Sequence, residues 1–241
     1  IADQVVFNNI ISKDRVDLVH INPSLLMRSF IRDGLFILWA KKRNIPVLVF
    51  FLGWDKNFEK QVVRYWMWFF NLTYGKADAF IVLASEFKEK LQAWGIKAPV
   101  HLETTTFDDK LLRQFSIEKK VKSALESKTI NILFMARLVR DKGAFESVEA
   151  LFNLIEIGCS VKLTIAGSGP LEKELRRLVG LRDKRGAVHI MGHIDGEVKR
   201  QVLEDSHILV FPTSYGEGMP ICVLEAMSCG LAIVTRPVGG L

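Results

Sequence analysis

The stretch FPTSYGEGMPICVLEAMSCG, residues 211–230, decides how this sequence is interpreted. The apolar run 207–211 has the length and β-branched character of a buried strand. Pro220 opens a predicted helix that extends to Met227 and is stopped by Gly230. Strand, glycine-containing loop and helix N-terminus in this order predict an anion site, because free N–H groups and the positive end of the helix dipole point the same way.

Two carboxylates bracket that predicted site. Glu217 stands between Gly216 and Gly218 in the loop, and Glu225 follows eight positions later, about two helical turns away. A carboxylate beside an anion site is suited to accept hydrogen bonds from hydroxyl groups. Because an anion attached to hydroxyls describes a nucleotide sugar, the stretch predicts a site for that class of ligand.

Composition places the chain among globular proteins, since 49% of its 241 residues are hydrophobic and 25% are charged. Three cysteines are too few for a disulfide framework and lack metal-ligand spacing, so we expect buried reduced thiols and a cytoplasmic protein. No apolar run approaches the roughly 20 residues that span a bilayer. The start lacks a signal peptide and an initiating methionine, which indicates a fragment or a processed product.

The net positive charge comes from the first half of the chain. Residues 1–128 hold 20 Lys and Arg against 14 Asp and Glu, whereas residues 129–241 hold 13 of each. A basic surface favours phosphate-bearing or anionic-lipid partners, and simple solubility explains it equally well. Sequence-specific nucleic-acid binding is not expected, because the basic residues are dispersed and no motif for a recognition helix is present.

The first half reads as strands alternating with helices. Apolar runs predict strands at 17–22, 45–52 and 77–83, with helices at 24–43 and 86–94 capped by Ser24 and Ser85 and a loop at 53–55. Strand and helix alternating at this spacing imply right-handed crossovers and a parallel sheet. Residues 101–128 lose the pattern, so we expect a linker at 116–128 between domains at 1–115 and 129–241.

The segment 56–76 is unusually aromatic and basic. One interpretation is an interfacial helix, with Trp and Tyr at the level of lipid headgroups and with Lys56, Lys60, Arg64 and Lys76 facing an anionic membrane. The other is an ordinary core helix packed on the sheet, since the run is apolar around most of its circumference. The sequence leaves both open.

The second half repeats the alternation. Strands are predicted at 131–136, 161–166, 188–194, 207–211 and 232–235, and helices at 143–157, 171–181, 196–205 and 220–227. Ligands of open parallel sheets bind at the carboxyl ends of the strands. After Ala136, Arg137 and Lys142 suit a diphosphate, although two solvated surface charges would look the same. The Gly-Ser-Gly at 167–169 lacks the third glycine of a dinucleotide fingerprint and predicts a tight turn.

Residues 130–241 resemble the nucleotide-binding half of the group 1 (family 4) retaining glycosyltransferases of the GT-B fold. The resemblance rests on ordered motifs at 136–143, 165–171, 192–194, 212–218, 225–230 and 238–240, and on the seven residues that separate Glu217 from Glu225. It implies an α/β chain with two Rossmann-like domains and parallel sheets, both incomplete. The first half resembles part of the acceptor domain, but Leu52 stands where many members carry His, so no role for that His is transferred.

The resemblance implies transfer of a sugar from a nucleotide-sugar donor to a saccharide or lipid-linked acceptor, as in polysaccharide biosynthesis, with retention and without a metal or cofactor. Arg137, Lys142 and the backbone at Gly218 and Met219 would stabilise the leaving diphosphate, and Pro220 would belong to the same donor-binding segment. Glu217 would bind the sugar, Glu225 the ribose, and Ile194 the base through its backbone. The expected location is the cytoplasm, peripheral on the inner membrane face. A nucleotide-sugar epimerase and a non-catalytic nucleotide-sugar or membrane-binding protein are the alternatives.

Overall fold

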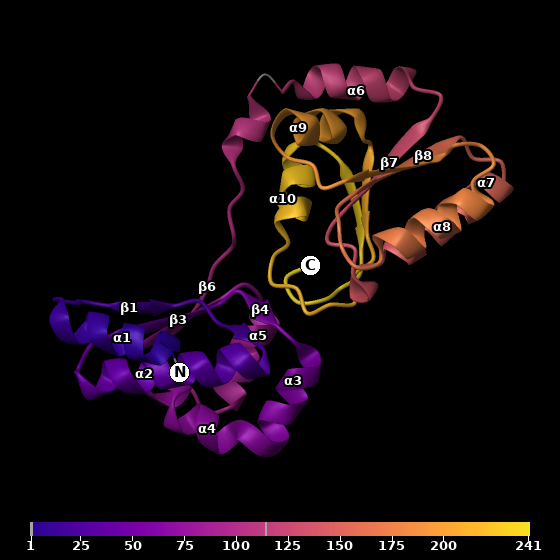
Figure 1. Cartoon of the computed structure of the whole chain (residues 1–241). Coiled ribbons are helices and arrows are strands. Elements are labelled where there is room, and N and C mark those ends of the chain that lie inside the picture. The colour runs from indigo at the N-terminus through magenta and orange to yellow at the C-terminus, as the bar shows by residue number, and fades with distance from the viewer. Residues whose placement is uncertain (1, 114) are drawn as a thin grey trace. The chain divides into compact units, whose positions relative to one another are not determined.

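Parallel strands build two main sheets and one small two-stranded sheet in the computed structural model, which describes residues 2–113 and 115–241 (Figure 1). Contacts divide the chain into two units. The first comprises Ile1–Thr105, Gly216–Met219 and Gly239–Leu241, and the second comprises Thr106–Tyr215 and Pro220–Val238. The predicted α/β class with parallel sheets is confirmed. The assignment of the halves to acceptor and donor sides stays a prediction.

The first sheet has the order β1-β3-β5-β6, with every pair parallel. Its strands are β1 (Val19–Ile21), β3 (Val47–Phe51), β5 (Ala79–Val82) and β6 (Val100–Leu102). The small two-stranded sheet pairs β2 (Ser24–Leu25) with β4 (Gly53–Trp54). Each crossover moves to the next strand in the same direction, so right-handed connections place the crossover helices on one face. Figure 1 shows α2 and α4 on the same side of β1 and β3.

Helices of the first unit enclose an aromatic core. They are α1 (Ala2–Lys13), α2 (Met27–Lys42), α3 (Lys56–Gln61), α4 (Met67–Leu72) and α5 (Ser85–Ala93), with a π-helical segment Val62–Trp66 between α3 and α4 and a 3-10 turn at Tyr74–Lys76. Tyr74 is fully buried, stacks on Phe30 with ring centroids 5.2 Å apart, and donates its hydroxyl to the Phe30 carbonyl at 3.0 Å. Desolvation raises the pKa of Tyr74 well above its ordinary value.

Both predicted serine caps in the first unit are wrong. Ser24 pairs through its backbone with Gly53 in the β2–β4 sheet, so α2 begins only at Met27. The residues around Gly53, expected to form a loop, thereby form a strand. Ser85 is the first residue of α5 and makes no cap. Instead, the Asp55 carboxylate caps α3 by accepting from the Phe58 N–H at 2.6 Å.

The second sheet has the order β11-β10-β7-β8-β9, again parallel throughout. Its strands are β7 (Ile130–Met135), β8 (Val161–Ala166), β9 (Val188–Gly192), β10 (Ile208–Phe211) and β11 (Ala232–Thr235). The helices are α6 (Ile117–Glu126), α7 (Ala144–Glu156), α8 (Glu172–Arg182), α9 (Gly196–Asp205) and α10 (Ile221–Ser228). Figure 1 shows α7 and α8 on one side of this sheet and α9 and α10 on the other.

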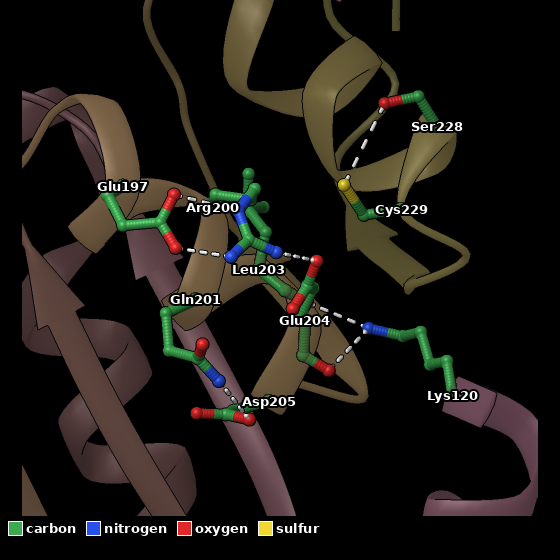
Figure 2. Close-up of polar contacts among 9 residues, drawn as sticks. All are labelled: Lys120, Glu197, Arg200, Gln201, Leu203, Glu204, Asp205, Ser228 and Cys229. Atoms are coloured by element: carbon green, nitrogen blue, oxygen red, sulfur yellow. Dashed lines mark hydrogen bonds and ion pairs between the residues drawn. The ribbon is translucent and has the colours of Figure 1, made fainter. Parts of the chain in front are cut away.

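Residues 116–128, expected as a linker, contain helix α6. Ser116 caps it by accepting from the Lys119 N–H at 3.2 Å. Lys120 is buried, and its ammonium donates to the carbonyl oxygens of Leu203, Glu204 and Ser206 at the end of α9 (Figure 2 draws the first two). The linker interpretation missed this helix, because a lysine-rich stretch gives no sign that one of its lysines is buried.

None of the three cysteines, all of which lie within the described residues, forms a disulfide, and they are not all buried. Cys229 is fully buried beside the Ser228 hydroxyl, whereas Cys159 is exposed and Cys222 is partly exposed. Burial raises the pKa of the Cys229 thiol (Figure 2). The expectation of buried thiols is therefore correct for Cys229 and wrong for Cys159.

Candidate functional site

The second sheet reverses its strand order between β7 and β10. The chain runs outward from β7 through β8 to β9, then returns to place β10 on the other side of β7, with Ile208 opposite Ile132 and Leu209 opposite Leu133. Such a reversal leaves the loops after the two central strands diverging, and ligands of open parallel sheets bind in the crevice between them. The loops that follow β7 and β10 are those that carry the predicted cations and the glycine-rich motif.

Hydrogen bonds to one backbone carbonyl oxygen join these two loops. The Asp141 carbonyl oxygen accepts from the backbone N–H of Ser214 at 2.8 Å and of Tyr215 at 3.3 Å. It also accepts from the hydroxyl of Thr213, which is fully buried, at 3.1 Å. The sequence suggested neighbouring loops, and the structure joins them with backbone bonds that a motif cannot reveal.

Lys142 is held by aromatic rings. Its Nζ lies 4.7 Å from the centroid of the Tyr215 ring and 5.6 Å from that of Phe211, within the range of cation–π attraction. The side chain is partly buried, whereas that of Arg137 is exposed. The alternative of two freely solvated charges therefore does not describe Lys142.

Close backbone approach explains two glycines of these loops. Gly143 has φ of 89°, and a Cβ there would lie 2.5 Å from Pro212 Cγ and 2.8 Å from the Pro212 carbonyl oxygen. At Gly167, a Cβ would lie 1.9 Å from the Ala136 carbonyl oxygen. The Gly-Ser-Gly segment thus packs its backbone directly on the loop after β7. The loops after β7, β8 and β10 consequently form one continuous rim.

Glu225 lies in the interior of the second unit, on α10. It is 5% exposed, and its Oε1 accepts from Lys199 Nζ of α9 at 2.6 Å. A carboxylate can accept about four hydrogen bonds, so this ion pair leaves acceptor capacity for hydroxyl groups. The sequence did not single out Lys199, because nothing in the α9 pattern shows which of its residues faces α10.

Glu217 is also buried, at 8% exposure, and contacts group it with the first unit. The loop around it is closed by the Gly240 N–H, which donates to the Gly218 carbonyl oxygen at 2.9 Å. The alternative that Glu217 and Glu225 are two exposed surface carboxylates is therefore wrong.

The other predicted donor-binding residues occupy loops and a helix start. Ile194 follows β9 and is partly buried, as are Met219 and Pro220, while Gly218 is buried. Pro220 occupies the cap position of α10, whose first N–H groups have no acceptor within the helix. The positive end of this helix is suited to an anion, and the anion site stays a prediction.

A cavity of about 630 Å³ opens elsewhere, over β8, β9 and α9, and is lined by residues such as Lys162, His189 and Gln201. None of the predicted site residues lines it, so the candidate site is the loop rim at the carboxyl ends of β7 and β10. Within residues 2–113 and 115–241, no group of three or more His, Cys, Asp or Glu side chains is placed to hold a metal ion.

Comparison with known proteins decides the family. The family model described as "Glycosyl transferases group 1" matches residues 115–241, more than half of the chain. The chain belongs to the group 1 glycosyltransferases. The predicted resemblance is thereby confirmed over residues 115–241, where the motifs lie.

Curated relatives of this group 1 glycosyltransferase include alpha-D-kanosaminyltransferase of Streptomyces kanamyceticus, 27% identical over 64% of this chain and 39% of the relative. Another is the putative teichuronic acid biosynthesis glycosyltransferase TuaC of Bacillus subtilis (strain 168), 25% identical over 84% of this chain and 49% of the relative. The chain therefore spans less than half the length of these relatives.

Solved structures confirm the GT-B fold. The structure of Anabaena Alr3699/HepE in complex with UDP and glucose matches with a TM-score of 0.72 at 16% identity, covering 98% of this chain and 63% of that one. Sucrose-phosphate synthase from Thermosynechococcus elongatus matches with a TM-score of 0.70 at 20% identity, covering 99% and 60%. At these identities the likeness shows the fold alone.

Proposed function

We propose that the protein to which this chain belongs transfers a sugar from a nucleotide-sugar donor to a saccharide or lipid-linked acceptor, with retention and without a metal ion. The observation that carries the proposal is that hydrogen bonds join the loops after β7 and β10, where the strand order of this group 1 glycosyltransferase reverses. One loop bears Arg137 and Lys142, and the other leads through the glycine-rich segment into α10. Cations and a helix N-terminus gathered at one rim suit a diphosphate.

The reaction needs stabilisation of the leaving nucleoside diphosphate, because negative charge develops on it as the glycosidic bond breaks. Arg137 and Lys142 would supply fixed positive charge, and backbone N–H groups at Gly218 and Met219 would donate to phosphate oxygens. Lys142 suits this role because the rings of Tyr215 and Phe211 hold its ammonium before substrate arrives. Pre-organised charge of this kind lowers the barrier without rearrangement during the reaction.

The buried carboxylates would orient the donor. Glu217 would accept hydrogen bonds from sugar hydroxyls and Glu225 from the ribose, while the backbone at Ile194 would contact the base. Support comes from their burial and from the structures of HepE, which were solved with UDP, with UDP and glucose, and with UDP-glucose. A carboxylate can accept about four hydrogen bonds, so each of these two can also accept from hydroxyl groups of a ligand.

The decisive experiment measures turnover in the full-length protein, with the donor chosen by a thermal-shift panel of nucleotide sugars. Arg137→Ala should cost about 3 kcal/mol in the transition state, or about 10²-fold in kcat/KM. Arg140→Ala is the matched control, since this exposed arginine lies on the same loop and has no proposed contact. Equal turnover by the two variants would show that Arg137 does not bind the diphosphate.

The role of Glu225 is separated from its ion pair by two variants. Glu225→Gln removes the carboxylate charge, and we expect about tenfold weaker binding of the nucleoside diphosphate, or about 1.4 kcal/mol. Lys199→Met removes the same ion pair but keeps the carboxylate, so it should lower the melting temperature more than it weakens binding. If both variants lose stability and binding in the same proportion, Glu225 is structural.

Retention and metal independence have direct tests on the same protein. Proton NMR of the product should show the anomeric configuration of the donor, and activity should persist in EDTA. The acceptor assay also addresses the alternatives. An epimerase would convert the nucleotide sugar without an acceptor, and a binding protein would give no product at all.

A further inference from the structure

The helical segment from Lys56 to Leu72 changes its geometry in the middle. Between α3 and α4, residues Val62–Trp66 adopt a π-helical turn, which accommodates one extra residue and so rotates the side chains that follow. Val62, Phe69 and Phe70 are consequently buried in the apolar core of the first unit. The core interpretation of this stretch is thus correct for one side of the helix only.

The other side exposes large apolar side chains. Val63 is 53% exposed, Tyr65 59%, Trp68 64% and Leu72 45%. Trp68 also stacks on Trp66, with ring centroids 6.3 Å apart. Soluble proteins rarely expose apolar side chains of this size in one place, and such patches commonly mark an interaction surface.

Positive charge lies among these apolar residues without any acidic residue. The segment 60–76 contains Lys60, Arg64 and Lys76, all exposed, and no Asp or Glu. The Arg64 guanidinium lies 5.1 Å from the ring centroid of Tyr65. The nearest preceding acid, Glu59, is engaged by Trp54 and Lys90. The charge of this surface is therefore uncompensated and complementary to an anionic partner.

We propose that one face of this helical segment binds the surface of an anionic lipid bilayer. This membrane face is made of Val63, Tyr65, Trp68 and Leu72 with Lys60, Arg64 and Lys76. Trp and Tyr prefer the boundary between headgroups and acyl chains, and Lys and Arg reach the phosphates above it. No helix of residues 2–113 and 115–241 is long and apolar enough to cross a bilayer. Exposed aromatic rings beside cations suit binding along the membrane surface. The proposal goes beyond sugar transfer and is independent of the donor site.

The test is flotation of the full-length protein with vesicles of phosphatidylglycerol and phosphatidylcholine, compared with vesicles of phosphatidylcholine alone. The wild type should bind the anionic vesicles and be released by salt. Lys60→Gln with Arg64→Gln should weaken binding about 25-fold, about fivefold for each cation near an anionic surface. Lys13→Gln with Lys97→Gln is the control, since it removes the same charge from exposed positions of the same unit.

The contribution of the apolar residues of the membrane face is tested by Trp68→Ser. Leu181→Ser on α8 is the control, because Leu181 is 63% exposed and Trp68 is 64% exposed. We expect at least tenfold weaker vesicle binding for Trp68→Ser and no change for Leu181→Ser. Both variants should keep the wild-type unfolding transition and the thermal shift with the donor, which separates this proposal from that of sugar transfer.

Three results would overturn the proposal. The first is equal vesicle binding by the paired cation variants, and the second is equal binding by the two serine variants. The third is a change of oligomeric state in Trp68→Ser, measured by light scattering, with vesicle binding intact; the face would then join two copies of the chain.

Discussion

Lys120→Met removes the ammonium that joins α6 to the end of α9. Its Nζ donates to the carbonyl oxygens of Leu203 at 2.7 Å and Glu204 at 3.1 Å (Figure 2), and to that of Ser206 at 2.7 Å. Carbonyls at a helix C-terminus lack intrahelical donors and carry the negative end of the helix dipole. A single buried cation therefore satisfies three acceptors that no backbone group would reach.

The expected loss is about 2–4 kcal/mol of unfolding free energy. Hydrogen bonds that involve a charged group contribute about 1.5–3 kcal/mol each. The three bonds are not additive, because burial opposes the charged form and lowers the pKa of Lys120. Methionine keeps most of the apolar stem, so the loss measures the ammonium and not a cavity.

Urea unfolding can be assigned to one unit because the five tryptophans all lie in residues 1–105 of the first unit. Tryptophan fluorescence reports on that unit, and far-UV circular dichroism reports on both. With an m-value of about 2 kcal/mol per molar, Lys120→Met should lower the midpoint of the dichroism transition by about 1–2 M. Lys122→Met, an exposed neighbour on the same helix, should stay within about 0.5 kcal/mol of wild type. If Lys120→Met also stays within that range, the three hydrogen bonds do not hold α6.

Two further predictions concern the same unit. Gly143→Ala should lower the free energy of unfolding by about 3 kcal/mol or more. The control is Gly158→Ala, where φ is 90° and no heavy atom lies within 4 Å of an added Cβ, so only backbone strain of about 1–2 kcal/mol is expected. Equal urea midpoints for the two variants would refute the close approach of Gly143 to Pro212. Burial lowers the pKa of His207, whose Nδ1 accepts from the Asn131 N–H at 3.0 Å. The unfolded state therefore binds more protons than the folded state, and stability is lost as pH falls below about 6.5. His207→Asn should make this loss smaller in urea midpoints measured from pH 7.5 to 5.

Much of the second unit followed from local pattern. The bounds of β8, α9 and β11 agree with those predicted. Apolar runs and helical periods can be identified from neighbouring residues in the sequence alone. The site's location followed from the same pattern, since strand order and loop position place Arg137 and Glu225 near a reversal in a parallel sheet. The family motifs sharpened these predictions without adding contacts.

Local pattern failed at particular places in both units. Ser24 looks like a helix cap, but its backbone pairs with Gly53, and long-range pairing outweighs a local cap. Lys120 looks like a linker residue, yet α9 offers it three carbonyls. The π-helical turn at Val62–Trp66 divides one aromatic stretch between core and surface, which no periodicity could foretell.

The sequence by itself determined the fold class, the parallel sheets and the two loops that form the candidate site, because these depend on the order and period of residues along the chain. Only the tertiary structure decided the partners of the polar groups: Lys199 for Glu225, the aromatic rings for Lys142, and the Asp141 carbonyl for the loop after β10. Such partners come from segments distant in sequence, and a buried polar group is satisfied by whatever donor or acceptor folding brings within reach.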